Sequence, residues 1–250
     1  MSQNYIITSG ELYHYGVKGM KWGVRKKRYT SSYDHDISLK KGDTIQNISG
    51  GKARDISNAS VVYAAHTKKD RARYAGMYAD QLKNWDGAKK VYKNDFVLTK
   101  DITIPSQKKA VELFVEAFKA NPKIMAKSIA KAQADLSFWD GFMGINLESK
   151  YTRKLINGGQ KYLETVGYKM FNESLVNTKY VGARNQYYKT LTKHGYDAIL
   201  DVNDINGGYK TEQPIIVFDP SKRLKATKPV ELTQRDIDLA LARYKDLTKD

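Results

Sequence analysis

The most constraining stretch of this sequence is a short apolar run enclosed by two prolines. Residues 215–218 (IIVF) are four apolar, β-favouring residues that lie between Pro214 and Pro220. Such a run is too short for a helix and fits a strand that is buried on both faces, near the centre of a sheet. A second short strand is predicted at 198–202, so we expect the polar segment 203–213 to connect the two strands.

The polar segment 203–213 is a candidate functional site. It contains Asp204, Glu212 and two consecutive glycines, and Asp201 lies just before it. Polar loops held by a rigid sheet often carry binding or catalytic residues. The same residue types are also typical of a solvated turn, so both interpretations stay open at this point.

Composition limits the class of protein. A chain of 250 residues can form one large domain with appendages and can bury a sizeable core. The absence of cysteine excludes a disulfide framework and thiolate metal sites. No stretch has the roughly 20 apolar residues that a membrane-spanning helix needs. The formal net charge of +16 predicts attraction to polyanions, including nucleic acid.

Residues 1–32 differ from the rest of the chain and are predicted to form a basic, flexible arm. Residues 1–30 carry six basic side chains against the single acid Glu11, a net charge of +5. Glycines interrupt any helical period between His14 and Arg28, while the apolar residues there can anchor the arm on another surface. The alternative is that these residues pack on the parent domain.

The rest of the sequence predicts an α+β fold. Strands are expected at three places, namely 37–48 with a Lys-Gly-Asp turn, 60–65, and 90–104, where the alternation favours an edge strand. Helices are expected after Thr67, after Ser106, from Pro122, within 153–172, over 180–193 and after Thr233. The order of these elements mixes strands and helices without a regular repeat.

The predicted elements suggest a division of the chain. We expect one domain over residues 33–228, with a helical insertion at about 106–175, followed by a C-terminal helix within 229–250. The aromatic segment 138–144 (FWDGFMG), which two glycines interrupt, is predicted to be a hinge or docking loop.

The arm carries a sequence motif. The segment HYGVKGMKWGVR resembles a tag, H-x-G-V-K-G-M-K-W-G-V-R, that recurs at the ends of minor head, portal-associated and neighbouring structural proteins of tailed phages and prophages of Gram-positive bacteria. The resemblance implies a phage or prophage protein, located in the virion or in the host bacterial cytoplasm. It also implies that His14 to Arg28 contact head or portal proteins. It implies no particular chemistry, because the tag accompanies several unrelated domains.

A second resemblance covers about residues 37–225. Four segments carry it: LKKGDTIQNIS, VVYAAHTKKDRARYA, KVYKNDFVLTKDITIPS and HGYDAILDVNDINGGYKTEQPIIVFDPSKRL. Together they are similar to the ADP-ribosyltransferase-like fold, closest to its phage-borne and toxin-like branch. The resemblance implies a split β-sheet core with flanking helices, and NAD as the candidate cofactor.

The family's NAD-binding positions transfer only in part. In active members of the R-S-E branch, an arginine on the first strand holds NAD, and a Ser-Thr-Ser stretch on the next strand shapes the nicotinamide pocket. The first position falls at Gln46 or Asn47. The second falls at Tyr63 and the two alanines after it, where only Thr67 keeps a hydroxyl nearby. The resemblance therefore implies Gln46, Asn47 and Thr67 as cofactor-binding residues and Tyr63 as an aromatic wall.

The family's catalytic glutamate, which engages the ribose, falls around 212–214. The best register puts Pro214 at its place and leaves Glu212 two residues earlier. Breaking the nicotinamide bond develops positive charge on the ribose, so a nearby carboxylate is a large contribution to catalysis. Glu212 and Asp204, or Asp201, are the candidates for this role.

Three functions remain open. The first is a phage-encoded structural or virion-associated protein whose ADP-ribosyltransferase-like domain is degenerate and contacts head or portal components. The second is an active transferase that moves ADP-ribose from NAD to a host protein, and the third is a nucleic-acid-binding protein or nuclease. No metal site is predicted, because none of the four histidines shows metal-ligand spacing.

Overall fold

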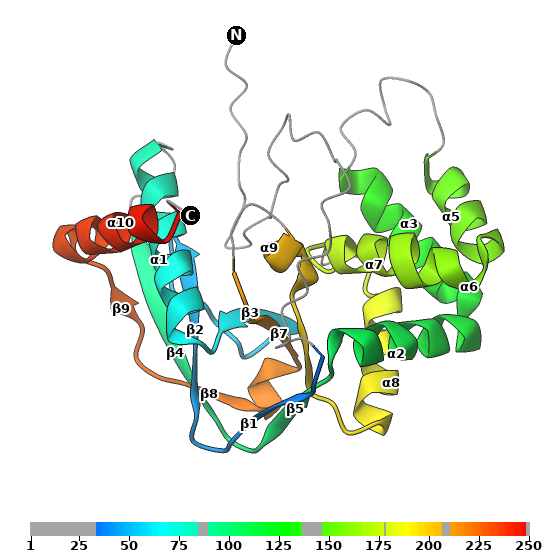
Figure 1. The fold of residues 1–250 in the computed structure, drawn as a ribbon, viewed down its shortest axis with the longest axis horizontal. Helices are drawn as coiled ribbons and strands as arrows, with labels where there is room; N and C mark the ends of the chain where they lie inside the picture. The colour runs from blue at the N-terminus through cyan, green and yellow to red at the C-terminus, as the bar shows by residue number, and fades with distance from the viewer. Residues whose placement is uncertain (1–33, 85–89, 137–146, 178, 207–210, 249–250) are drawn as a thin grey trace, which may run out of the picture. The chain divides into compact units, whose positions relative to one another are not determined.

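The computed structural model describes residues 34–84, 90–136, 147–177, 179–206 and 211–248 (Figure 1). These residues form a mixed helix-and-strand fold with an antiparallel sheet, so the predicted class is confirmed at this level. They divide into two compact units. Unit 1 holds the described parts of Ser38–Ile102 and of Asp204–Asp250, and unit 2 holds residues 34–37 and the described part of 103–203. The predicted arm (1–32) and the segment 138–144 lie outside the described residues.

The sheet of unit 1 has the strand order β7-β3-β2-β4-β8, and β9 also pairs with β4. The strands are β2 (Thr44–Gly50), β3 (Val61–Ala65), β4 (Val91–Leu98), β7 (Pro214–Phe218), β8 (Leu224–Ala226) and β9 (Val230–Glu231). All of these pairs are antiparallel.

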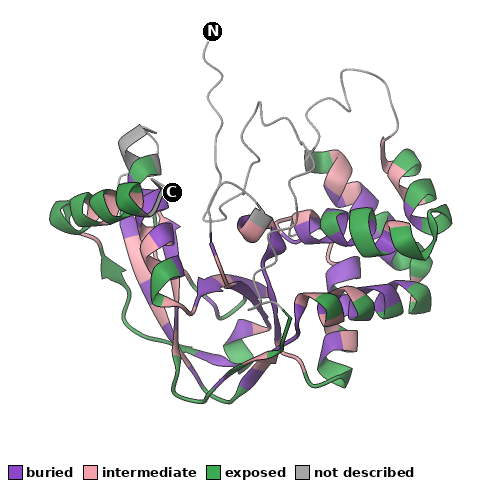
Figure 2. Ribbon diagram, in the orientation of Figure 1, coloured by how far each residue is buried: buried purple, intermediate pink, exposed green. Residues whose placement is uncertain are grey.

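The apolar run between the two prolines forms a buried strand, as predicted. All five residues of β7 are buried, and its partner β3 is buried at four of five positions (Figure 2). The Lys-Gly-Asp turn before β2 is also confirmed. Gly42 adopts a φ of 93°, which glycine reaches without steric cost, and this lets the Asp43 N–H donate to the Lys40 carbonyl at 2.9 Å.

The prediction of one edge strand over 90–104 is wrong. The segment forms β4 and a separate strand, β5 (Ile102–Ile104), which pairs with β1 (Ile37–Leu39). β4 has partners on both sides, with β2 on one and β8 and β9 on the other. Alternation reports that one face of a strand is less buried than the other, and it carries no information about neighbours along the hydrogen-bonding direction.

Two long helices of unit 1 pack on each other. They are α1 (Lys68–Asn84) and α10 (Gln234–Thr248), and α1 also packs on β2 and β3 (Figure 1). Both N-caps are as predicted. The Thr67 hydroxyl accepts from the Asp70 N–H at 3.1 Å, while Thr233 and Asp236 each accept the other's backbone N–H.

Close contact between these helices depends on Gly76. A Cβ atom at this position would lie 2.2 Å from the Cβ of Tyr244 and 2.8 Å from the carbonyl oxygen of Ala240. The absence of a side chain at Gly76 therefore lets the α10 backbone approach α1.

Unit 2 is a helical cluster that also contains the short strand β6 (Ala198–Leu200). Its helical elements are α2 (Gln107–Ala120), α3 (Pro122–Leu136), α5 (Leu147–Asn157), α6 (Gly159–Tyr162), the π-helical turn η2 (Leu163–Gly167), α7 (Tyr168–Ser174) and α8 (Gly182–Lys193). Ser106 caps α2 as predicted. The helix expected within 153–172 is present. α5 ends at Asn157, Gly159 takes a φ of 73°, and α6, η2 and α7 then follow one another without a gap to Ser174.

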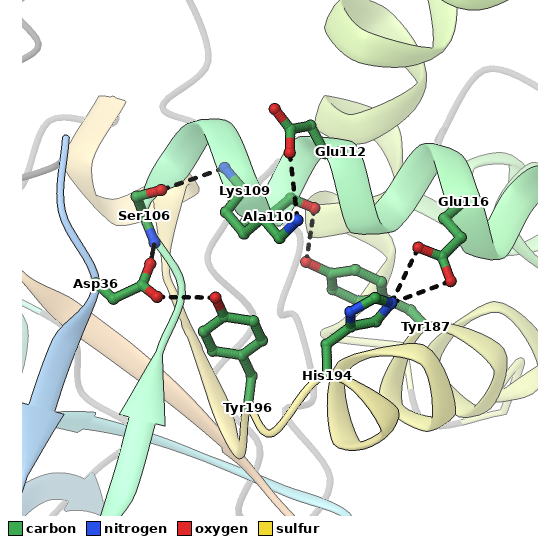
Figure 3. A network of polar contacts seen from close by, with 9 residues as sticks. All are labelled: Asp36, Ser106, Lys109, Ala110, Glu112, Glu116, Tyr187, His194 and Tyr196. Atoms are coloured by element: carbon green, nitrogen blue, oxygen red, sulfur yellow. Dashed lines mark hydrogen bonds and ion pairs between the residues drawn. The ribbon is translucent and has the colours of Figure 1, made fainter.

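Aromatic rings form the core of unit 2. Phe114 of α2 lies against Tyr168, Phe171 and Tyr187, with ring centroids 5.2–6.2 Å apart. The buried Tyr187 hydroxyl donates to the Ala110 carbonyl at 3.0 Å, so its polar group is satisfied (Figure 3). These contacts join α2, α7 and α8 into one body.

Asp36 fixes the start of the described chain to unit 2. Its carboxylate accepts the Ser106 N–H at 2.8 Å and the Tyr196 hydroxyl at 2.8 Å (Figure 3). Burial, together with the bond to Asp36, raises the pKa of Tyr196 to about 12, so this hydroxyl stays a donor at neutral pH. Asp36 therefore lies next to the N-terminus of α2.

We expect Asp36→Ala to lower the free energy of unfolding by about 1–2 kcal/mol, because two hydrogen bonds are lost. Tyr196→Phe removes only one of them and should cost about half as much. Urea unfolding measures both effects. Asp34→Ala is the control, since Asp34 is also exposed, and an equal loss in this variant would contradict the role given to Asp36.

Candidate functional site

The positions expected to form the site are adjacent in the sheet of unit 1. Gln46 of β2 is the register partner of Ala65 of β3, and Ala65 is the partner of Pro214 of β7. The three positions therefore lie in one row across three neighbouring strands. Segments that are far apart in the sequence meet here, at the end of β3 and the beginning of β7.

The first position carries amides that are engaged in the sheet. The Gln46 side chain donates to Asp95 of β4 at 2.8 Å, and the Asn47 side chain donates to the Tyr63 carbonyl at 2.9 Å. Neither residue supplies a positive charge, and Asp95 adds a carboxylate beside Gln46. This end of the row is poorly suited to hold a pyrophosphate, which favours a guanidinium partner.

An arginine on the adjacent helix α1 is bonded to the backbone. Arg71 of α1 donates from Nη2 to the carbonyls of Thr44 and His66, the latter at 3.2 Å. Thr67, predicted to bind the cofactor, caps α1 through its hydroxyl. Both residues thus stabilise the junction between β3 and α1.

Glu212 forms an ion pair with Lys69 of α1. The two side chains are 44% and 45% exposed. The charge of the Glu212 carboxylate is therefore partly compensated, and it can stabilise a ribose cation only if the pair opens. The glycines of the predicted site loop, 207 and 208, lie outside the described residues.

Asp70 holds the start of β7, a role that the sequence does not indicate. Its carboxylate is fully buried and accepts the backbone N–H groups of Glu212 and Gln213, each at 2.8 Å. Nη1 of Arg73, one turn further along α1, lies 4.0 Å from it. An acid in the first turn of a helix is common, so its sequence position offers no signal for this role.

His66 and Gln213 lie beside this anchor. Nε2 of His66 is 3.0 Å from the side-chain oxygen of Gln213. Burial lowers the pKa of His66, an effect that the hydrogen bond to Gln213 only partly opposes. A neutral imidazole is therefore present at physiological pH, where it can accept or donate a hydrogen bond but adds no positive charge.

Asp204 occupies a different environment from Glu212. It lies in the short helix α9 (Val202–Asn206), is 1% exposed, and accepts a hydrogen bond from the Tyr74 hydroxyl of α1. Burial raises the pKa of Asp204 to about 7, and the charge of Asp70 adds to the shift, while the Tyr74 bond opposes it. Near neutral pH such a carboxyl group is a mixture of charged and protonated forms, which suits proton transfer better than charge stabilisation.

The two remaining candidates, Tyr63 and Asp201, lie in the sheet and at the start of a helix. Tyr63 is half-buried on β3 and is the register partner of Ile216 of β7. Asp201 is buried and accepts the Asn203 N–H at 3.1 Å, which begins α9. Within the described residues, no group of three or more His, Cys, Asp or Glu side chains could hold a metal ion. No described helix is long and apolar enough to cross a membrane.

Comparison with known proteins gives a match to a family model. A family model described as a family of unknown function (DUF7211) matches residues 7–29. The matched segment lies within the predicted arm and includes the whole tag between His14 and Arg28. None of the curated proteins and none of the solved structures matches the chain.

Proposed function

We propose that this chain is a phage or prophage structural protein whose unit 1 is an ADP-ribosyltransferase-like domain used for binding. The row of Gln46, Ala65 and Pro214 across β2, β3 and β7 carries this proposal. The resemblance assigns the three NAD-site positions of that fold to these strands, and the register brings them together. The same row supports loss of the transferase reaction, since it lacks an arginine and a free acid.

The arm supplies the second part of the proposal. The tag between His14 and Arg28 resembles those of phage head and portal-associated proteins, and its charge suits an acidic surface. We infer that it docks the chain on head or portal proteins, in the virion or, before assembly, in the host cytoplasm. Mass spectrometry of purified particles tests this: we expect the chain in the particle fraction. Recovery from the soluble host fraction alone would overturn the structural role.

We expect little or no NAD turnover by the isolated protein. Without a guanidinium at Gln46 or Asn47 the pyrophosphate loses its bidentate partner. In addition, Lys69 partly compensates the charge of the Glu212 carboxylate. Nicotinamide release from labelled NAD, with and without host lysate, is the measurement. Any turnover that occurs should fall by roughly 100-fold in Glu212→Gln, if this carboxylate stabilises the developing cation.

The matched control is Glu231→Gln. Glu231 is also in unit 1, is about as exposed as Glu212, and also pairs with a lysine, Lys90, at 2.9 Å. Turnover should be the same in this variant as in the parent protein. Rapid turnover that survives Glu212→Gln would exclude Glu212 and would favour the active-transferase alternative, with Asp204 as its acid. Labelled host proteins would identify the acceptor.

A further inference from the structure

The helix α3 of unit 2 carries a stripe of lysines. Lys123, Lys127 and Lys131 follow one another at intervals of four residues, so they lie on one side of the helix, about 6 Å apart along its axis. Lys123 and Lys127 are exposed, and Lys131 is half-exposed. The opposite face of α3 is buried in the unit through Met125, Ile129 and their neighbours.

The stripe is not neutralised by the described part of the chain. Other lysines of unit 2 pair with acids on their own helix, as Lys109 does with Glu112 and Lys169 with Glu173. Among the described residues, none of the three stripe lysines lies within ion-pair distance of a carboxylate. Like charges four residues apart destabilise a helix by a few tenths of a kcal/mol per pair. With only the described residues around it, the stripe therefore lowers helix stability unless a further anion binds it.

Two helix N-termini add to the positive potential. Neither α3 nor α8 has an acid in its first turn, and Val181, the N-cap of α8, provides no side-chain cap. Gly182 brings the start of α8 against α3, since a Cβ atom there would lie 3.2 Å from Ile124 and 3.3 Å from Ser128. The partial positive charge of a helix N-terminus favours phosphate groups.

An aromatic ring and an acid mark the far end of the stripe. The Ser128 hydroxyl donates to the Tyr180 carbonyl at 2.8 Å, and Nζ of Lys131 lies 5.7 Å from the centre of the Tyr180 ring. Asp135 follows Lys131 at the next interval of four residues and pairs with Lys179 at 4.0 Å. The cationic surface thus runs from Lys123 to Tyr180 and ends at Asp135.

We propose that this α3 surface, Lys123, Lys127, Lys131 and Tyr180 beside the α8 N-terminus, binds the phosphate backbone of nucleic acid without reading its sequence. A line of lysines with no ion-pair partner among the described residues complements a line of phosphates, and the chain's net charge of +16 draws polyanions to it. A membrane is a poorer fit, because interfacial helices insert an apolar face, and the apolar face of α3 is already buried.

The test compares two triple variants of the full chain. One is Lys123→Gln, Lys127→Gln and Lys131→Gln. The control is Lys161→Gln, Lys189→Gln and Lys193→Gln, three exposed lysines elsewhere in unit 2. Both remove the same charge, and glutamine has a helix propensity close to that of lysine, so folding should be kept. Thermal melting checks this, with the stripe variant as stable as the parent or slightly more stable.

Binding to fluorescent duplex DNA and to single-stranded RNA is then titrated over a series of salt concentrations. For duplex DNA, each phosphate contact contributes about 0.9 to the slope of log affinity against log salt. In the stripe variant, the magnitude of this slope should fall by about two to three and the affinity should fall at least about tenfold. The control should change little. If the stripe variant loses affinity for only one of the two, duplex DNA or single-stranded RNA, that nucleic acid is the one the surface binds.

Three outcomes would overturn the proposal. Equal losses in both triple variants would show that net charge alone governs binding. An unchanged stripe variant would exclude the surface. Loss of binding to vesicles of anionic lipid, with nucleic-acid binding intact, would assign the α3 surface to membranes. The proposal is independent of the NAD site in unit 1, so either can fail alone.

Discussion

Asp204→Asn is expected to stabilise the protein above pH 7, by an amount on the order of 4 kcal/mol. Burial raises the pKa of the Asp204 carboxyl group to about 7 in the folded protein, against its ordinary value of 3.8. Below about pH 4 the group is protonated in both folded and unfolded states. As the pH rises to 7 the unfolded state loses its proton first, so the parent protein loses stability over this interval. Asparagine has no proton to lose.

Urea unfolding at several pH values between 4 and 8 measures this effect. The difference in unfolding free energy between Asp204→Asn and the parent should grow from pH 4 to pH 7 and then level off. Tyr74→Phe is the informative companion variant, because the Tyr74 hydroxyl lowers the pKa of Asp204. Its removal should extend the loss of stability to higher pH. Parallel pH curves for Asp204→Asn and the parent would contradict the assignment.

Gly76→Ala is expected to lower the free energy of unfolding by about 1–3 kcal/mol, the usual cost of overpacking. In a helix interior this substitution normally stabilises by about 1 kcal/mol, so the prediction reverses the usual sign. The reason is the contact of Gly76 with α10, where the added Cβ atom would lie 2.2 Å from that of Tyr244. Both atoms are close to the helix backbones, so the helices must separate.

Denaturant unfolding gives the stability, and hydrogen exchange of residues 234–248 shows whether α10 separates from α1. A chain that ends at Thr233 is the control, since it has no α10 to contact. In that shorter chain Gly76→Ala should be neutral or stabilising. Equal destabilisation in both chains would place the steric conflict somewhere other than α10.

Local signals in the sequence predicted much of the fold. The apolar run between two prolines formed the buried strand β7, and Thr67, Ser106 and Thr233 capped the helices that followed them. A cap or a short apolar run acts through neighbours within a few residues, so its pattern is complete in the sequence. The edge position predicted for 90–104 failed because strand neighbours are set by tertiary pairing.

The contacts at the candidate site leave no such local trace. Asp70 accepts the N–H groups of residues more than a hundred positions away, and Lys69 pairs with Glu212 across the same interval. The residues next to Asp70 and Glu212 in the sequence are equally compatible with a carboxylate that is exposed to solvent. The short helix α9, which buries Asp204 against Tyr74, was likewise predicted only as a polar connection.

The pairing of β3 with β7 has a consequence for synthesis of the chain. Ala65 pairs with Pro214, so the ribosome must make all of 66–213, including most of unit 2, before β3 meets this partner. At about 5–20 residues per second the delay is roughly 7–30 s. During that time an apolar strand, VVYAA, has an unpaired edge, which is a template for association with other chains. We expect nascent chains that stop before residue 214 to bind chaperones or to aggregate, and chains that include β7 to be released.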